Sequence, residues 1–171
     1  MNVCQGNLED KEYLKQITHK ESYVREDGLR TILLVEDSAS DVELTRRALS
    51  KSRIEVSIDV AEDGVEALDY LFCEGVYSYR NQHPLPDLIL LDLNIPKIDG
   101  NEVLKRIRAN DKTKLIPIVI LTSSNEDSDL LKAYNAGANS YIRKPVDFNQ
   151  FAEVVNHLGR YWLQINEPPP K

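Results

Sequence analysis

Acidic side chains follow two short apolar runs of this chain. Asp92 ends the run Asp87-Leu-Ile-Leu-Leu-Asp92, and Glu36-Asp37 follows the run Thr31-Ile-Leu-Leu-Val35. Short apolar runs separated by helical segments are typical of buried parallel strands, and ligands bind beyond the carboxyl ends of such strands. Three carboxylates at neighbouring strand ends would supply hard oxygen ligands for a divalent cation. They would also leave one carboxylate free to act as a nucleophile.

Length, charge and cysteine content exclude several classes of protein. The 171 residues suffice for one domain with a sizeable core. The formal net charge of -7, without a block of Lys and Arg, argues against nucleic-acid binding. Cys4 and Cys73 are too few for a disulfide framework and lack metal-ligand spacing. Because no apolar stretch approaches the length of a membrane span, we expect a cytoplasmic protein with no membrane partner.

The apolar pattern alternates between strand and helix periods from about residue 31 onward. We expect strands at 31–35, 54–60, 87–92, 117–122 and 140–143, and helices at 39–51, 64–73, 100–109, 126–136 and 147–165. Five strands alternating with five helices predict one doubly wound, parallel α/β sheet. On this interpretation residues 1–29 are an N-terminal extension, 30–166 the folded domain and 167–171 a Pro-rich tail. Residues 73–86 are expected to be a polar insert with exposed aromatic side chains, Tyr77 and Tyr79 among them.

Four of the expected strand ends carry residues that could share one site. Glu36-Asp37, Asp92, Thr122 and Lys144 end the first, third, fourth and fifth strands. Each has an ordinary explanation on its own, since acids and hydroxyls cap helices and lysines lie in solvated loops. Because the strand ends converge on one rim of the sheet, their joint occurrence favours a common functional site.

This set of residues, in this order, resembles the receiver domain of two-component response regulators over residues 31–165. The resemblance rests on the acidic pair, on Asp92-Leu-Asn94-Ile-Pro96-Lys-Ile-Asp99-Gly100, on Thr122-Ser123-Ser124 and on Lys144-Pro145. More narrowly, the 73–86 insert and the ending Tyr161-Trp162-Leu163 are similar to the small single-domain response regulators of cyanobacterial phytochromes. The resemblance implies a flavodoxin-like sheet in the strand order 2-1-3-4-5. It also implies a signalling protein rather than an enzyme.

The resemblance further implies how the acidic residues would act. Asp92 would be the phosphoacceptor and would take a phosphoryl group from a sensor histidine kinase, with a phytochrome as the expected kinase. Glu36, Asp37, Asp92 and the backbone carbonyl of Asn94 would bind Mg²⁺. That ion would relieve repulsion between the crowded carboxylates and neutralise the incoming phosphoryl oxygens.

Residues of the fourth and fifth strands would complete the site and transmit its state. Lys144 would pair with Asp92 and then with a phosphoryl oxygen, and the Thr122 hydroxyl would bind another. Thr122 and Tyr141 would form a two-state switch. The resemblance also suggests a cis peptide bond before Pro145. Because Asn94 and Ser124 are not evident catalytic bases, we expect only slow self-dephosphorylation.

Apolar residues on the last two helices suggest how a signal leaves the domain. Phe148, Phe151, Val155, Leu158 and Trp162 recur at helical spacing and are expected to face the core. A second set of apolar residues lies on helix faces that the core need not cover. This set predicts a homodimer through the fourth helix, fifth strand and fifth helix. Its members are Leu130, Tyr134, Val154, Tyr161 and Ile165. The alternative is that this second set only caps the sheet edge.

Three other functions stay open as alternatives. A receiver could act by docking alone, without phosphorylation. A flavodoxin-like electron carrier would need a phosphate-binding loop after the first strand, where the acidic segment 36–41 would repel a flavin phosphate. A phosphatase with a carboxylate nucleophile would need an acid two positions after Asp92, where Asn94 stands.

Overall fold

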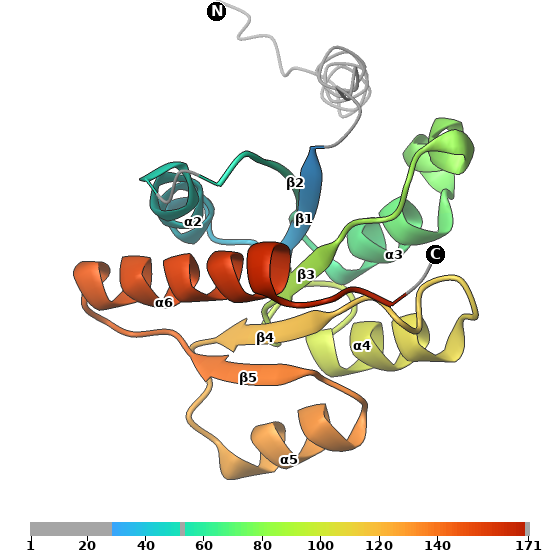
Figure 1. Cartoon of the computed structure of the whole chain (residues 1–171). Coiled ribbons are helices and arrows are strands. Elements are labelled where there is room, and N and C mark those ends of the chain that lie inside the picture. Colours follow the sequence, from blue (N-terminus) through green and yellow to red (C-terminus); the bar gives the residue numbers. More distant parts are fainter. Residues whose placement is uncertain (1–28, 52–53, 170–171) are drawn as a thin grey trace, which may run out of the picture.

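The computed structural model describes residues 29–51 and 54–169 and shows a five-stranded parallel sheet between two layers of helices (Figure 1). The strands are β1 (Arg30–Val35), β2 (Val56–Ala61), β3 (Leu88–Leu91), β4 (Ile118–Thr122) and β5 (Ser140–Arg143). They pair in the order β2-β1-β3-β4-β5, which confirms the doubly wound sheet and its flavodoxin-like order. Nearly all of the proposed extension (1–28), and the last two residues of the proposed tail, lie outside the described residues.

Five α-helices cover the two faces of the sheet, as the alternation predicts. They are α2 (Ala39–Lys51), α3 (Gly64–Phe72), α4 (Gly100–Ala109), α5 (Asp127–Asn135) and α6 (Phe148–Arg160). Helices α3, α4 and α5 lie on one face, and α2 and α6 lie together on the other (Figure 1). Within the described part of the chain, none of the helices combines the length and the apolar character needed to cross a membrane.

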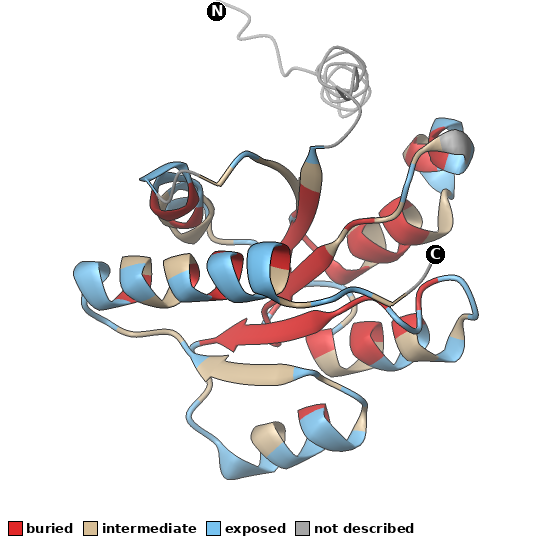
Figure 2. Cartoon of the chain, viewed as in Figure 1, coloured by how far each residue is buried: buried red, intermediate tan, exposed pale blue. Residues whose placement is uncertain are grey.

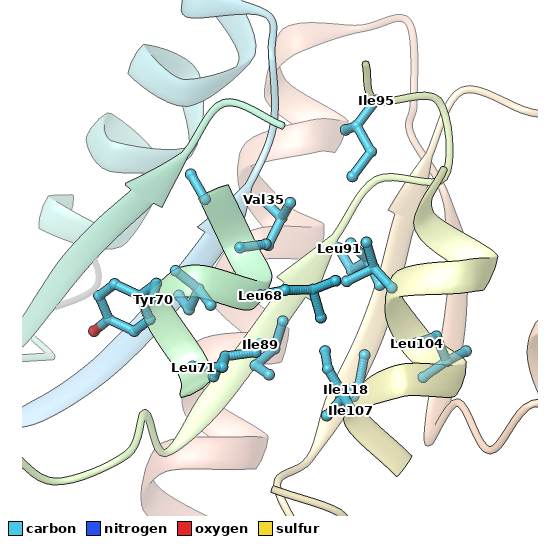
Figure 3. Packing of buried hydrophobic residues seen from close by; sticks show 14 of the residues in the cluster. Val35, Leu68, Tyr70, Leu71, Ile89, Leu91, Ile95, Leu104, Ile107 and Ile118 are labelled. Atoms are coloured by element: carbon cyan, nitrogen blue, oxygen red, sulfur yellow. The ribbon is translucent and has the colours of Figure 1, made fainter. Parts of the chain in front are cut away.

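Both faces of the sheet are buried, which explains why the central strands are uninterrupted apolar runs. Successive side chains of a strand point to opposite faces. Leu33 and Val35 of β1 therefore pack with α3 and α4, whereas Ile32 and Leu34 pack with α2 and α6. Strands β1, β3 and β4 are buried along almost their whole length (Figure 2). Side chains from these strands interlock with α3 and α4 in the larger cluster (Figure 3).

The C-terminal helix differs from the prediction at both ends. Helix α6 ends at Arg160 and continues as a π-helical turn, η2 (Tyr161–Ile165). A π-turn returns to the same face after five residues, so Leu163 follows Leu158 into the core and Trp162 is only half-buried. The expectation that Phe148 faces the core is wrong, because it opens the first turn of α6 and is exposed.

The insert between α3 and β3 is folded rather than an exposed loop. Residues Gly75–Gln82 form a 3₁₀-helix, η1, and bury the side chains of Tyr77 and Arg80. The Tyr77 hydroxyl donates to Glu66 Oε1 at 2.8 Å, and Arg80 Nη1 donates to the carbonyl of Tyr70 at 2.9 Å. The Arg80 guanidinium also lies 3.5 Å from the centre of the Tyr70 ring. The expectation of an exposed Tyr77 is therefore wrong, whereas Tyr79 is exposed.

Gly100 sets how closely α4 approaches the end of β3. A Cβ atom at this position would lie 2.4 Å from the carbonyl oxygen of Asp92 and 2.7 Å from Leu93 Cα. The preceding Asp99 caps the helix, because its Oδ1 accepts from the backbone N–H groups of Asn101 and Glu102. This pair of residues therefore fixes the start of α4 against the backbone that carries Asp92.

We predict that Gly100→Ala lowers the free energy of unfolding by about 2 kcal/mol, within the range for overpacking a tight site. Helix propensity would favour the variant by less than the roughly 1 kcal/mol of a helix interior, because Gly100 is the first residue of α4, so the two effects have opposite signs. The contact is with backbone, which cannot rotate away, and the clash should dominate. Urea unfolding measures the difference, with exposed Lys105→Ala on the same helix as the control. Stabilisation by Gly100→Ala would show that the close approach does not constrain the fold.

Candidate functional site

Asp92 follows β3 at the carboxyl edge of the sheet and is 5% exposed. Its Oδ1 accepts a hydrogen bond from Thr122 Oγ1 at 2.7 Å and another from the backbone N–H of Asn94 at 3.0 Å. Its Oδ2 accepts from Lys144 Nζ at 2.7 Å. Hydrogen bonds to an ionised group are the strong ones. Both carboxylate oxygens are therefore held in a fixed orientation by residues from two other strand ends.

The Lys144 ammonium joins the ends of several elements. Its Nζ donates to Glu36 Oε2 at 2.5 Å, to Asp92 Oδ2 at 2.7 Å and to Asp41 Oδ2 at 2.8 Å. The side chain is 8% exposed, so these interactions form largely out of contact with water. The backbone N–H of Lys144 also donates to the carbonyl of Thr122 at 2.7 Å, which anchors the end of β5 to β4.

The predicted site residues do not all converge. Glu36, Asp92, Thr122 and Lys144 are joined by the hydrogen bonds above. Asp37, by contrast, is exposed, and so is the side chain of Asn94, whose backbone contacts Asp92 instead.

Two further predictions concern β5 and the loop after it. Tyr141 is half-buried on β5, and its hydroxyl oxygen is buried without a hydrogen-bond partner in the part of the chain that the structure describes. The expected cis bond before Pro145 is wrong, since the Lys144–Pro145 peptide is trans. The trans form is the one that general X–Pro energetics favours in the absence of a specific constraint.

Asp41 belongs to the site, although its sequence motif did not predict that role. It lies in the first turn of α2, five residues after Glu36, and contacts the same ammonium. The signal that could have found it is its position. The first turn of the helix after β1 returns over the carboxyl edge of the sheet, where the other acids lie.

For both Glu36 and Lys144, burial and neighbouring charges shift the pKa in opposite directions. Burial raises the pKa of Glu36 above its usual range, and the hydrogen bond and charge of Lys144 only partly offset that effect. Burial alone would lower the pKa of Lys144, but its hydrogen bonds to Asp41, Asp92 and Glu36 outweigh this and raise it above its usual value. Lys144 is therefore cationic at neutral pH, and one cation faces three carboxylates.

The surplus of negative charge fits a hard divalent cation such as Mg²⁺. Carboxylate and carbonyl oxygens are the ligands that Mg²⁺ takes. Glu36 and Asp37 also line a hollow of about 250 Å³, whose other walls come from α2 and the end of β2 rather than from Asp92 or Lys144. In residues 29–51 and 54–169 no group of three or more Asp, Glu, His or Cys side chains is arranged so that it could hold a metal ion. The reason is visible in the contacts: the Lys144 ammonium lies where the carboxylates of Glu36 and Asp92 meet.

We predict that Lys144→Met lowers the free energy of unfolding by about 3–5 kcal/mol at pH 7, because it leaves buried carboxylates unpaired. The wild-type interaction is fully present below the ordinary lysine value of 10.5 and is lost only as the pH rises through the higher folded pKa. As the pH falls toward 4.5, the ordinary pKa of Glu36, the carboxylates take up protons and no longer need a cation. The difference in free energy of unfolding between the variant and wild type should therefore shrink. Denaturant titrations at several pH values measure it, with exposed Lys105→Met as the control. An equal deficit at pH 7 and pH 4 would contradict the electrostatic explanation.

Comparison with known sequences gives the chain a family. The sequence model of the response regulator receiver domain matches residues 32–156. The chain is 40% identical to the probable methanogenesis regulatory protein FilR2 of Methanothrix harundinacea (strain 6Ac), over 81% of this chain and 86% of that protein. It is 38% identical to the response regulator Rcp1 of Synechocystis sp. (strain PCC 6803), over 79% of this chain and 90% of that protein.

Comparison with solved structures leads to the same family. The phosphorylated cyanobacterial phytochrome response regulator RcpA superposes with a TM-score of 0.78 at 37% identity, covering 84% of this chain and all of that one. The Mn²⁺-bound form of Rcp1 superposes with a TM-score of 0.76 at 37% identity, covering 82% of this chain and 99% of that one. The matched region carries both the sheet and the acidic pocket at its edge, and the chain therefore belongs to the response regulator receiver domain family.

Proposed function

We propose that Asp92 accepts a phosphoryl group from the phosphohistidine of a sensor histidine kinase in a Mg²⁺-dependent step, and that the modified domain signals by altered protein contacts. The observation that carries this proposal is the buried Asp92 carboxylate, oriented by Thr122 Oγ1 and Lys144 Nζ at 2.7 Å each. Receiver domains of this family are signalling domains that interact with sensor histidine kinases, which supports the proposal.

The side chains of the site have defined roles in an in-line transfer. An oxygen of Asp92 forms a bond to phosphorus while the phosphorus–nitrogen bond of the donor breaks. The bonding electron pair goes to the imidazole nitrogen, which takes up a proton. Lys144 and Thr122 bind the phosphoryl oxygens and so stabilise charge in a site that largely excludes water.

The metal ligands that we propose are those implied by the resemblance to receiver domains. Glu36, Asp37, Asp92 and the backbone carbonyl of Asn94 would hold Mg²⁺, which neutralises charge on the transferred group when bound. Receiver domains bind divalent metal ions, and the Mn²⁺-bound structure of Rcp1 supports a metal here. Because Lys144 lies between Glu36 and Asp92, metal binding would require Glu36 to exchange the ammonium for the ion or for its water shell.

A phytochrome is the kinase that we propose as the partner. The support is the similarity to Rcp1 and to RcpA, which is a phytochrome response regulator. FilR2 is as similar in sequence, and its name refers to methanogenesis. The proposal of a phytochrome therefore rests on RcpA rather than on FilR2.

Loss of the phosphoryl group should be slow. A fast reaction would need a side chain that activates water beside Asp92. The Asn94 side chain is an exposed amide, and the Ser124 hydroxyl donates to Asp129 Oδ2 at 2.8 Å. Because neither group is a base, we propose that self-dephosphorylation is slow and that the domain is not an enzyme.

The switch is proposed for Thr122 and Tyr141. The Thr122 hydroxyl already donates to Asp92, and the Tyr141 hydroxyl is buried without a partner among the described residues. A phosphoryl group on Asp92 would take over the hydrogen bond of Thr122. That change would alter the packing space next to Tyr141 on the neighbouring strand β5. The modification need only bias an equilibrium between two packings.

Replacing the nucleophile tests the proposed transfer. We expect the wild-type chain to gain one phosphoryl group from phosphoramidate or from an autophosphorylated phytochrome kinase with Mg²⁺. Asp92→Asn should gain none, because an amide cannot form the acyl phosphate. Intact-mass measurement before and after hydroxylamine, which cleaves acyl phosphates, gives the readout, with Asp111→Asn on an exposed loop as the control. Labelling of Asp92→Asn at the wild-type level would refute Asp92 as the acceptor, whereas a wild-type chain that gains no phosphoryl group from either donor would favour docking alone.

A homodimer through the edge of the sheet is the proposed output. Strand β5 is an edge strand, flanked by α5 and α6. Val154 and Tyr161 line a hollow together with Ser140 and Ile142 of β5. Tyr134 on α5 and Ile165 at the end of η2 are exposed, and Leu130 on α5 is half-buried. An open strand edge with apolar side chains around it favours association.

Two aliphatic residues of equal exposure provide a matched test of this interface. Ile165 and Leu115 are each 60% exposed, but Leu115 lies in the α4–β4 loop, which is not one of the elements of the proposed interface. We expect Ile165→Lys to raise the dimer dissociation constant about tenfold or more, and Leu115→Lys to leave it unchanged. Sedimentation velocity with and without a phosphoryl donor measures both. A wild-type chain that stays monomeric in both conditions would rule the dimer out.

A further inference from the structure

Asp41, a carboxylate outside the acidic pair, shares the ammonium of Lys144 with Glu36 and Asp92. Its Oδ2 lies 2.8 Å from Lys144 Nζ. Resting on the proposed function, we propose that Asp41 is a positioning residue that competes with the phosphoryl group for Lys144. In this role the contact holds the ammonium in place before transfer and limits how tightly a phosphoryl group is bound afterwards.

The donors of Lys144 are fully used in the structure. An ammonium group carries three N–H donors, and three carboxylates accept from it. A phosphoryl oxygen on Asp92 needs such a donor and also needs the positive charge. Whatever Lys144 gives to the phosphoryl group is therefore withdrawn from one of its present partners.

The three contacts of Lys144 differ in the free-energy cost of breaking them. The side chains of Glu36 and Asp92 are 4% and 6% exposed, whereas that of Asp41 is 30% exposed. A buried carboxylate that loses its cation keeps its charge out of reach of water, which is expensive. Asp41 can be hydrated in place, and its position in the first turn of α2 also suits a negative charge. The contact with Asp41 is thus the one that yields at least cost.

Asp92 itself changes character on modification. As an acyl phosphate it no longer carries a carboxylate charge, so its hold on Lys144 weakens while Glu36 and Asp41 keep theirs. Glu36 would then be a proposed metal ligand, which leaves Asp41 as the carboxylate that draws Lys144 away from the phosphoryl oxygens. Removing the charge of Asp41 should therefore strengthen the interaction of Lys144 with a phosphoryl group.

The test compares Asp41→Asn with Glu43→Gln, which removes a charge from the same helix. Glu43 is exposed and pairs with Arg47 at 2.6 Å rather than with Lys144. The probe is trifluoroberyllate, a phosphoryl analogue that binds carboxylates, titrated at saturating Mg²⁺ and followed by ¹⁹F NMR. We expect Asp41→Asn to bind it about three- to tenfold more tightly than wild type and Glu43→Gln to bind it as wild type does.

A second readout reports on Lys144 itself. In the metal-free protein the ammonium protons of Lys144 should be protected from exchange with water, so that their ¹H–¹⁵N resonance is observable. Asp41→Asn should shift this resonance, and Glu43→Gln should not. A merely structural role of Asp41 would not change this signal selectively.

The outcomes separate the two proposals. If wild type binds the probe but Asp41→Asn matches Glu43→Gln in affinity, or binds more weakly than wild type, the competition is refuted and the proposed function stands. An unshifted ammonium resonance in Asp41→Asn refutes the positioning role. If wild type binds neither the probe nor a phosphoryl group at Asp92, the proposed function falls and this inference falls with it.

Discussion

The interaction of one buried ammonium with three carboxylates holds this site together. Lys144, at the end of β5, reaches Glu36 after β1, Asp92 after β3 and Asp41 in α2. Without the cation, the acids would repel one another in a place where water cannot screen them. With it, the acids still outnumber the cation. The same arrangement therefore stabilises the folded domain and leaves a surplus of negative charge that a divalent ion can neutralise.

The fold supplies this geometry because a parallel sheet covered on both faces brings its strand ends to one edge. Burial of β1, β3 and β4 fixes where each strand stops, and backbone hydrogen bonds fix the path of the loops beyond the strand ends. Gly100 allows α4 to start against the backbone of Asp92, and the backbone contact between Lys144 and Thr122 ties the last two strand ends together. The position of each functional group is thus a consequence of packing well away from it.

The strands and most helix bounds were predictable from apolar periodicity, which reports burial directly, whereas the order of the strands came from the family resemblance. Contacts that depend on the rotation of a helix or on the course of a loop were not predictable from the sequence. Asp41 reaches Lys144 only because of how the first turn of α2 is oriented, and Leu163 reaches the core only through a π-turn. Tyr77 is buried because an Arg–Tyr stack folds the insert, and a polar sequence gives no periodic sign of that. Asp37 and Asn94 show the converse: their motif positions were evident, whereas their side chains are exposed.

The most direct measurement is a crystal structure of the chain with Mg²⁺ and trifluoroberyllate. If Asp92 is the phosphoacceptor, beryllium will be bonded to one of its carboxylate oxygens, with Thr122 Oγ1 and Lys144 Nζ in contact with fluorine atoms. The metal will then lie beside Glu36 or Asp37. An adduct on another residue, or a Lys144 side chain that points away from the adduct, would contradict the assignment of this pocket as the phosphoacceptor site.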